Sequence, residues 1–215
     1  MLCLNSLPAE RARGCRFAEK FESPTAVAKN RGTVVGAVPI LPGKGADFSG
    51  ADGNAITYPM SCILNKNVLN FVIEFTPDFA SNDGTTRIIF DTTNGQRFQI
   101  AKRGSNTIYL WHESAGYILE SSAADALLYW KTYQQNVIVA SIISGENYLW
   151  LNGILIASSV TAWLNMNPDT LYVGSRFSST LSFNGRITNF KIFTGSTAAD
   201  LLTAQEAKDY YLRGA

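Results

Sequence analysis

The chain has 215 residues, of which 46% are hydrophobic and 16% are charged, and its formal net charge is +1. Such a length suits one all-β domain, because many sandwiches and barrels of about 200–250 residues form single units. The small net charge argues against a nucleic-acid binder, since phosphate recognition relies on a surplus of Lys and Arg. The sequence has no run of about 18 apolar residues, so it predicts no membrane span.

The first 31 residues form a basic segment with six Lys or Arg and three Glu, a local charge of +3 against −2 for the rest. We treat residues 1–16 as a basic N-terminal arm whose assembly residues are Arg11, Arg13 and Arg16. The arm either lies solvated or docked on its own domain, or it grips an acidic partner. We expect it to cross to a neighbouring chain in a homo-oligomer or larger assembly. No basic stretch precedes the first apolar residues, so we expect no signal peptide.

Three cysteines, Cys3, Cys15 and Cys62, are spaced irregularly. An odd count without regular spacing argues against a disulfide framework or a zinc site. Either all three are reduced thiols, or Cys3 and Cys15 are bridged. With one histidine and no CxxC pair, the chain has few ligands for a transition metal, and we expect no cofactor.

Short apolar stretches separated by turn dipeptides dominate the chain from about residue 33. Six turn signals, such as Asp83-Gly84 and Asn184-Gly185, separate many of them. Many short strands with turns at this spacing are typical of a sandwich or barrel. The expected strands are 33–38, 46–49, 54–58, 69–76, 86–91, 96–102, 107–113, 116–120, 136–143, 147–151, 154–159, 170–174 and 186–193.

The stretch ENYLWLNGILIA at 146–157 predicts a hairpin, because Asn-Gly is typical of a two-residue type I′ turn. With Asn152-Gly153 at the turn, Trp150 lies opposite Leu155 and Leu149 opposite Ile156. One face then carries Leu149, Leu151, Ile154 and Ile156, and the other carries Tyr148, Trp150, Leu155 and Ala157. The first face is typical of a core. The aromatic face is either a second buried layer or a surface that meets a partner.

One short C-terminal helix is expected at about 204–212. Thr203 and Glu206 have the spacing of a capping box, and Leu202 and Ala207 that of a hydrophobic staple. Gly214 suits the helix end. A second helical turn is expected at 123–129. The predicted fold class is therefore all-β, an antiparallel β-sandwich of jelly-roll type with one short C-terminal helix.

Several stretches together resemble the concanavalin A-like lectin/glucanase superfamily, in its laminin-G-like, pentraxin-related branch. They are NRGTVVGA (30–37), GADFSGADGNAITYP (45–59), FVIEF (71–75), WKTYQQNVIVAS (130–141), YLWLNG (148–153), LYVGSR (171–176), FNGRITNFKIF (183–193) and LTAQEAKDYY (202–211). The resemblance implies a domain over about 17–215. The superfamily hosts lectins, glycan-binding modules, adhesion domains, glycosidases and phage structural proteins, so the fold alone does not assign a function.

Catalytic groups of the glucanase type are not evident in the sequence. A retaining glycosidase needs two carboxyls about 5 Å apart, whereas Glu74 stands alone between phenylalanines and Asp91 is followed by Thr-Thr-Asn. His112, the single histidine, lies in a strand stretch, and the chain has no GxSxG elbow. We expect no enzyme activity and place His112 at the surface or in a groove.

Calcium would need carboxylates and carbonyl oxygens close together. The candidate pairs are Asp47 with Asp52, Asp78 with Asp83, and Asp91 with Asn94. None brings three acidic oxygens together at tight spacing, and turn formation accounts for Asp83 and Asn94. A structural calcium is therefore not favoured.

Surplus aromatic side chains are the main indication of a ligand surface. Such rings can stack on sugars, fill a core or form a subunit interface. The candidate ligand-binding residues are Tyr109, Trp111, His112, Tyr148 and Trp150. The sequence favours a non-catalytic lectin-like module that binds glycans or a cell surface within a larger assembly. The alternatives are a purely structural virion protein, such as a capsid decoration, neck or fibre component, and, third, a glycoside hydrolase.

Overall fold

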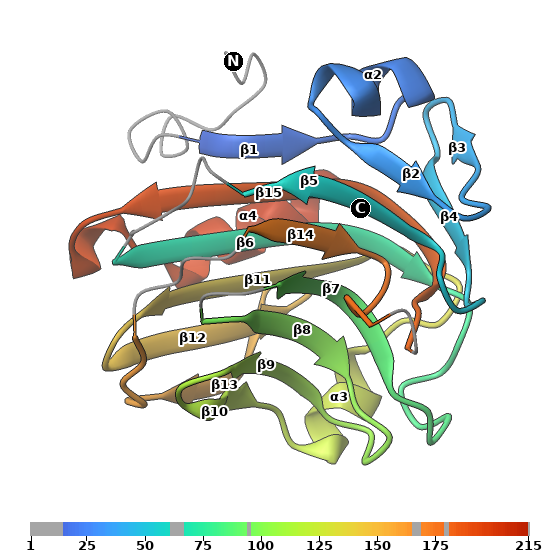
Figure 1. Cartoon of the computed structure of the whole chain (residues 1–215). Helices are drawn as coiled ribbons and strands as arrows, with labels where there is room; N and C mark the ends of the chain where they lie inside the picture. The colour runs from blue at the N-terminus through green and yellow to red at the C-terminus, as the bar shows by residue number, and fades with distance from the viewer. Residues whose placement is uncertain (1–14, 61–66, 94–95, 165–168, 179–180, 215) are drawn as a thin grey trace.

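Two antiparallel sheets packed face to face form the molecule, as predicted (Figure 1). The computed structural model describes residues 15–60, 67–93, 96–164, 169–178 and 181–214. Hydrophobic side chains from the inner faces of both sheets interdigitate in one large core. This arrangement follows from the period-two patterning of the strands, which places alternate residues on the shared inner side.

The first sheet has eight strands in the order β13-β12-β11-β6-β15-β4-β3, and β1 pairs with β15. Its longest strands, β6 and β15, lie side by side near the middle. The bounds are β1 Cys15–Glu19, β3 Ile40–Leu41, β4 Gly45–Ser49, β6 Val68–Pro77, β11 Asn136–Ile143, β12 Glu146–Leu151, β13 Ile154–Ser159 and β15 Asn184–Gly195.

The second sheet has seven strands in the order β10-β9-β8-β7-β14-β5-β2. All of its pairings are antiparallel. The bounds are β2 Thr33–Val35, β5 Ala55–Pro59, β7 Arg87–Thr93, β8 Phe98–Lys102, β9 Ile108–His112, β10 Gly116–Glu120 and β14 Thr170–Val173.

Strand β6 shows how alternation fills the core. Phe71, Ile73 and Phe75 are fully buried in the main core, whereas Val72 faces a second apolar cluster on the outer side. Phe71 meets the ring of Phe90 from the opposite sheet at a centroid distance of 5.2 Å. Such aromatic pairs add about 0.5–1.5 kcal/mol beyond simple burial, so this contact helps to join the two layers.

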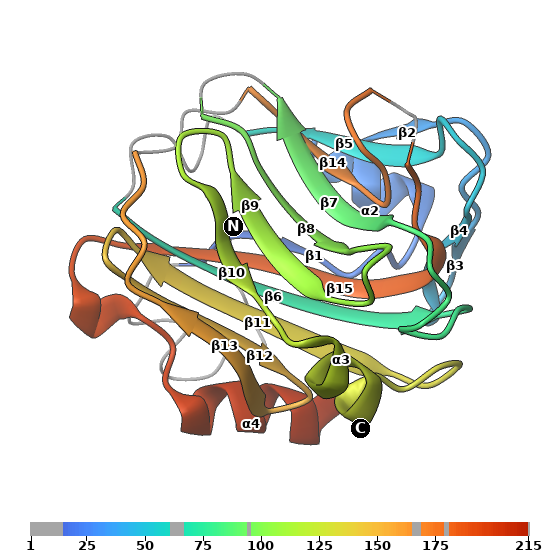
Figure 2. The same ribbon diagram turned by 90° about the horizontal axis from the view of Figure 1, so that it is seen from below.

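The helical segments are short and lie outside the two sheets (Figure 2). They are α2 Pro24–Lys29, α3 Ala123–Tyr129, the 3-10 turn η1 Ala198–Asp200, and α4 Ala204–Gly214. Helix α3 confirms the expected turn at 123–129, and Ser122 caps it by accepting from the amide of Asp125 at 2.9 Å. Helix α2, capped by Ser23, was not predicted. None of the described helices has the length and apolar character that a membrane crossing requires.

Helix α4 begins as predicted with a reciprocal capping box. The amide of Thr203 donates to Glu206 Oε2 at 2.8 Å, and the amide of Glu206 donates to Thr203 Oγ1 at 3.3 Å. Leu202 and Ala207 are both buried in one apolar cluster beneath the helix, which confirms the staple. Figure 2 shows α4 lying along the outer side of the eight-stranded sheet.

The β12–β13 turn has the predicted residues in the predicted conformation, with φ of 53° at Asn152 and 78° at Gly153. The predicted register holds only for the first two pairs. Beyond Trp150 a β-bulge shifts the pairing so that Leu149 faces Ala157, which leaves Ile156 as the extra residue. Both Ile156 and Ala157 therefore pack against the main core.

The N-terminal boundary differs slightly from the predicted arm. Strand β1 begins at Cys15, whose Cα is paired with that of Phe193 in β15. Arg16 belongs to this strand, so the end of the arm is part of the eight-stranded sheet. Arg11, Arg13, Cys3 and Cys62 lie outside the described residues.

Candidate ligand-binding site

Tyr109 and Trp111 lie on the outer face of the seven-stranded sheet. Alternation along β9 directs Ile108 and Leu110 into the main core and these two rings outward. Tyr109 packs with Ile88 and Ala101 in a small apolar cluster that Trp111 borders. Tyr109 and Trp111 therefore share the outer face of β9, and Ile108 and Leu110 share the inner one.

His112 lies on the inner side of β9 and is fully buried, so its predicted place at the surface or in a groove is wrong. Its ring packs 5.6 Å from that of Trp163, and the amide of Ser114 donates to its Nδ1 at 3.2 Å. Burial lowers the pKa of His112 to about 4, so the ring is neutral at physiological pH. Because His112 directly follows the outward-facing Trp111 in β9, the alternation of side chains along a strand already indicated that His112 points inward.

Tyr148 and Trp150 lie on the other sheet, away from the β9 rings. Trp150 is only 3% exposed and packs with Leu202, Ala207 and Tyr210 beneath α4. Tyr148 is half-buried beside it, with a ring-centroid distance of 5.5 Å. Trp150 and Tyr148 thus belong to a second apolar layer, whereas Leu155 of the same predicted face is 50% exposed and Ala157 packs against the main core. The five predicted ligand-binding residues do not form one site.

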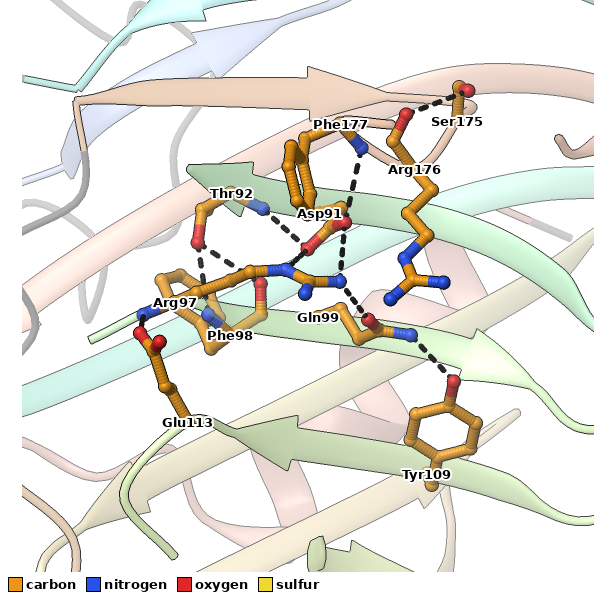
Figure 3. A network of polar contacts seen from close by, with 10 residues as sticks. All are labelled: Asp91, Thr92, Arg97, Phe98, Gln99, Tyr109, Glu113, Ser175, Arg176 and Phe177. Atoms are coloured by element: carbon orange, nitrogen blue, oxygen red, sulfur yellow. Dashed lines mark hydrogen bonds and ion pairs between the residues drawn. The ribbon is translucent and has the colours of Figure 1, made fainter. Parts of the chain in front are cut away.

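A buried ion pair organises the outer face of the seven-stranded sheet (Figure 3). Arg97 donates two hydrogen bonds to the fully buried Asp91, from Nε to Oδ1 at 2.8 Å and from Nη2 to Oδ2 at 2.9 Å. The amides of Thr92 and Phe177 also donate to Asp91, at 2.8 and 3.2 Å. Both carboxylate oxygens are therefore engaged, which suits a structural anchor better than an acid–base group.

Two aromatic rings enclose the Arg97 guanidinium. Its Cζ lies 5.2 Å from the ring centroid of Trp111 and 4.5 Å from that of Phe177. Cation–π contacts of this kind contribute about 0.5–2 kcal/mol, most where water is excluded. Together with the ion pair, they hold both rings at set positions on the face.

Gln99 extends this network toward β9. Its Oε1 accepts from Arg97 Nη2 at 2.8 Å, and its Nε2 donates to the Tyr109 hydroxyl at 2.6 Å. Burial raises the pKa of Tyr109 to about 12, so the phenol stays neutral. The polar network is thus continuous from β7 through β8 to β9, as Figure 3 shows.

Several side chains on this face remain accessible to a ligand. Phe177 is 41% exposed and Tyr117 is 44% exposed, and Trp111, Tyr172 and Arg176 are partly exposed. Phe177 and Arg176 come from the connection between β14 and β15, which reaches over the sheet. The face therefore offers rigid aromatic rings and charged donors side by side.

Two of the carboxylates considered for calcium, Asp83 and Asp91, form ion pairs with cationic side chains. Asp83 forms ion pairs with Lys102 and Arg87. Burial acts to raise the pKa of Asp83, but the bonds from Lys102 and the Thr85 amide outweigh it, so the pKa is lowered. Within the described residues, no three His, Cys, Asp or Glu side chains gather in a group that could hold a metal ion.

A separate open pocket of about 260 Å³ involves the eight-stranded sheet. Lys20, Glu22 and Glu74 line it, together with Asn189, whose Nδ2 donates to Glu74 Oε1 at 2.8 Å. Its lining is polar and has no aromatic ring. The pocket is thus distinct from the aromatic face around Trp111.

Sequence reasoning missed Asp91, Arg97, Gln99, Arg176 and Phe177 as members of one site. A weak signal was present, because Gln99 interrupts the apolar side chains of β8 at an outward position. No local pattern indicated that residues 176 and 177 would reach the same face as Arg97. Only the fold brings these distant segments together.

Comparison with known proteins identified one matching family. A family model described as the concanavalin A-like lectin/glucanases superfamily matches residues 67–202, which is more than half of the chain. No curated protein sequence matched.

Solved structures with a similar fold include proteins that act on or bind carbohydrates. Domain 4 of an extracellular GH43 arabinanase from Geobacillus stearothermophilus, in complex with arabinotriose, has a TM-score of 0.60 at 16% identity, covering 84% of this chain and 87% of that one. Trypanosoma rangeli sialidase in complex with sialic acid has a TM-score of 0.60 at 14% identity, and the match covers 84% of this chain and 29% of the sialidase chain.

The receptor-binding domain of botulinum neurotoxin mosaic serotype C/D is a third similar structure. It gives a TM-score of 0.64 at 15% identity, covering 92% of this chain and 46% of that one. The chain therefore spans less than half of the sialidase and toxin chains. At these identities the likeness concerns the fold.

Proposed function

The chain belongs to the concanavalin A-like lectin/glucanases superfamily, and on that premise we propose that it is a non-catalytic, lectin-like module. Its ligand would be a glycan or a glycan-bearing cell surface. The binding surface would be the outer face of the seven-stranded sheet, around Trp111, Phe177 and Tyr117. The observation that carries the proposal is the pair of rings fixed around Arg97 on a partly exposed face.

Physical chemistry supports a sugar as the ligand of such a face. Sugars present apolar C–H surfaces that stack on aromatic rings, and hydroxyls that need hydrogen-bond partners. Because the Asp91–Arg97 pair and Gln99 already fix the geometry, little side-chain entropy is lost on binding. The engagement of both Asp91 oxygens supports binding rather than glycosidic cleavage on this face.

A glycan array followed by titration calorimetry tests this proposal. We expect Phe177→Ala to weaken binding about tenfold or more, since about 1.4 kcal/mol of stacking corresponds to tenfold in affinity. Tyr133→Ala, which removes a 72% exposed ring from the α3–β11 connection, serves as the matched control. A wild-type protein that binds no glycan, or equal affinity in Phe177→Ala and wild type, would contradict the proposal.

We also propose that the module is a subunit of a larger assembly, as a homo-oligomer or a surface component such as a virion protein. The observation that favours it is the +3 charge of residues 1–31 against −2 for the remainder. Deletion of residues 1–14 keeps β1 intact, so light scattering after size exclusion reports on the arm alone. An unchanged mass would contradict a role of the arm in assembly. Normal assembly without glycan binding would favour a purely structural role.

A further inference from the structure

Arg176 stands apart from the other charged groups on the outer face of the seven-stranded sheet. Its backbone is held in place, because its amide donates to the carbonyl of Leu181 at 2.9 Å and its carbonyl accepts from Ser175 Oγ at 3.1 Å. Figure 3 shows its side chain extending over the sheet with the guanidinium near Gln99. Its Nε is buried and has no hydrogen-bond partner in the described structure.

Arg97 provides the internal comparison on the same face. Its guanidinium donates to Asp91 from Nε and Nη2 and to Gln99 from Nη2, and it lies between two aromatic rings. Arg176 forms no ion pair with any described carboxylate. Arg97 is thus neutralised by Asp91, whereas Arg176 has no ion-pair partner in the part of the chain that the structure describes.

Two other acidic groups of this sheet, Glu113 and Glu120, have hydrogen-bond partners of their own. Glu113 accepts from the Arg97 amide at 3.0 Å, and Glu120 accepts from Arg103 and Thr107 at 3.3 and 2.7 Å. Among the undescribed residues, the segments 61–66, 94–95, 165–168 and 179–180 contain no Asp or Glu, and Glu10 is the one acidic side chain of the segment 1–14. A counter-charge for Arg176 is therefore best supplied by a ligand, since a partly buried cation favours an anionic partner.

We propose that Arg176 binds the carboxylate of an acidic sugar, such as a uronic or sialic-type residue, while the sugar ring stacks on Phe177. A guanidinium presents a planar fork that matches a carboxylate with two parallel hydrogen bonds. Phe177 is the next residue in the chain and is 41% exposed, so both contacts come from one connection. This inference rests on the proposed glycan-binding function and specifies the ligand class of the same face.

Titration with matched ligand pairs tests the inference. Each acidic oligosaccharide that binds is compared with its methyl ester, which keeps the sugar but removes the charge. We expect wild type to bind the acid at least tenfold more tightly than the ester. Arg176→Gln should abolish that preference while leaving ester affinity unchanged, and Arg176→Lys should retain part of it. Arg213→Gln, an exposed arginine in α4, should behave as wild type.

The outcomes separate the two proposals. Binding of neutral glycans without any preference for the acid overturns the inference about Arg176 but leaves glycan binding in place. A preference that persists in a folded Arg176→Gln protein overturns it as well. Absence of binding to every glycan overturns both. Because the acid–ester comparison uses the wild-type protein, the test does not depend on the stability of the variant.

Discussion

The outer faces of the two sheets differ in what covers them. On the eight-stranded sheet, Val72, Val139 and Trp150 pack beneath α4 in a second apolar cluster. On the seven-stranded sheet, the outer face is a polar network around Asp91 and Arg97, with only a small apolar base. The first face contributes to stability through burial, whereas the second keeps aromatic rings and charges available. Both sheets direct aromatic side chains outward by the same alternation, but α4 covers those of the eight-stranded sheet only.

The largest effect is expected from Trp150→Ala beneath α4. Removing a nearly fully buried tryptophan should lower the free energy of unfolding by about 3–5 kcal/mol. Trp111→Ala on the other face should cost about 1–2 kcal/mol, because that ring is partly exposed. Urea denaturation measures both. Equal losses in the two variants would contradict the distinction between a buried outer face and a partly exposed one.

Asp91→Asn tests whether the ion pair holds the second face together. Breaking a buried pair leaves Arg97 without its counter-charge, so we expect a loss of about 2–4 kcal/mol in the free energy of unfolding. Asp52→Asn, at an exposed position, is the control and should be neutral. Combining Asp91→Asn with Arg97→Gln should recover part of the loss. Strictly additive effects would show that the two residues are not coupled.

The inner side of β9 should respond to pH through His112. The folded pKa is about 4 against an ordinary value of 6.5, so the unfolded chain takes up the proton first. Stability from this group is complete above about pH 6.5 and is lost as the pH falls toward 4, by on the order of 2 kcal/mol. Thermal melting across this range should show a smaller decline in His112→Asn than in wild type. Parallel declines would contradict the assignment.

Gly153→Val tests how closely the β12–β13 turn packs against α4. Gly153 has φ of 78°, and an added Cβ would lie 3.0 Å from Lys208 Cα in that helix. We expect a loss of about 2 kcal/mol in the free energy of unfolding. Gly145→Val has a similar backbone strain, with φ of 93° but no atom within 4 Å, so it should cost less. Equal losses measured by denaturation would show that the helix contact is unimportant.

Much of the fold could be predicted because its signals are local. Alternation in 69–76, the Asn152-Gly153 turn and the Thr203–Glu206 capping box depend on neighbouring residues, and each is present. The bulge opposite Trp150 could not be predicted, because it depends on how Ile156 and Ala157 both reach the core. Helix α2 was missed because it is only six residues long.

The candidate site was predictable only in part. The outward direction of Tyr109 and Trp111 follows from the period of two along β9, and the same rule places His112 inside. Trp150 has an equally aromatic setting in the sequence, but α4, about 55 residues later in the chain, covers it. Which aromatic face is buried depends on where a distant helix packs.

The amino-acid sequence alone determined the strands, the turns and the side on which each strand residue projects, because these properties follow from backbone sterics and hydrophobic period. Only the tertiary structure decided which outer face α4 covers and which arginine on the other face is paired. Those outcomes arise from contacts between segments far apart in the chain, such as Asp91 with the amide of Phe177. Long-range packing therefore converted one of two similar aromatic surfaces into core and left the other accessible.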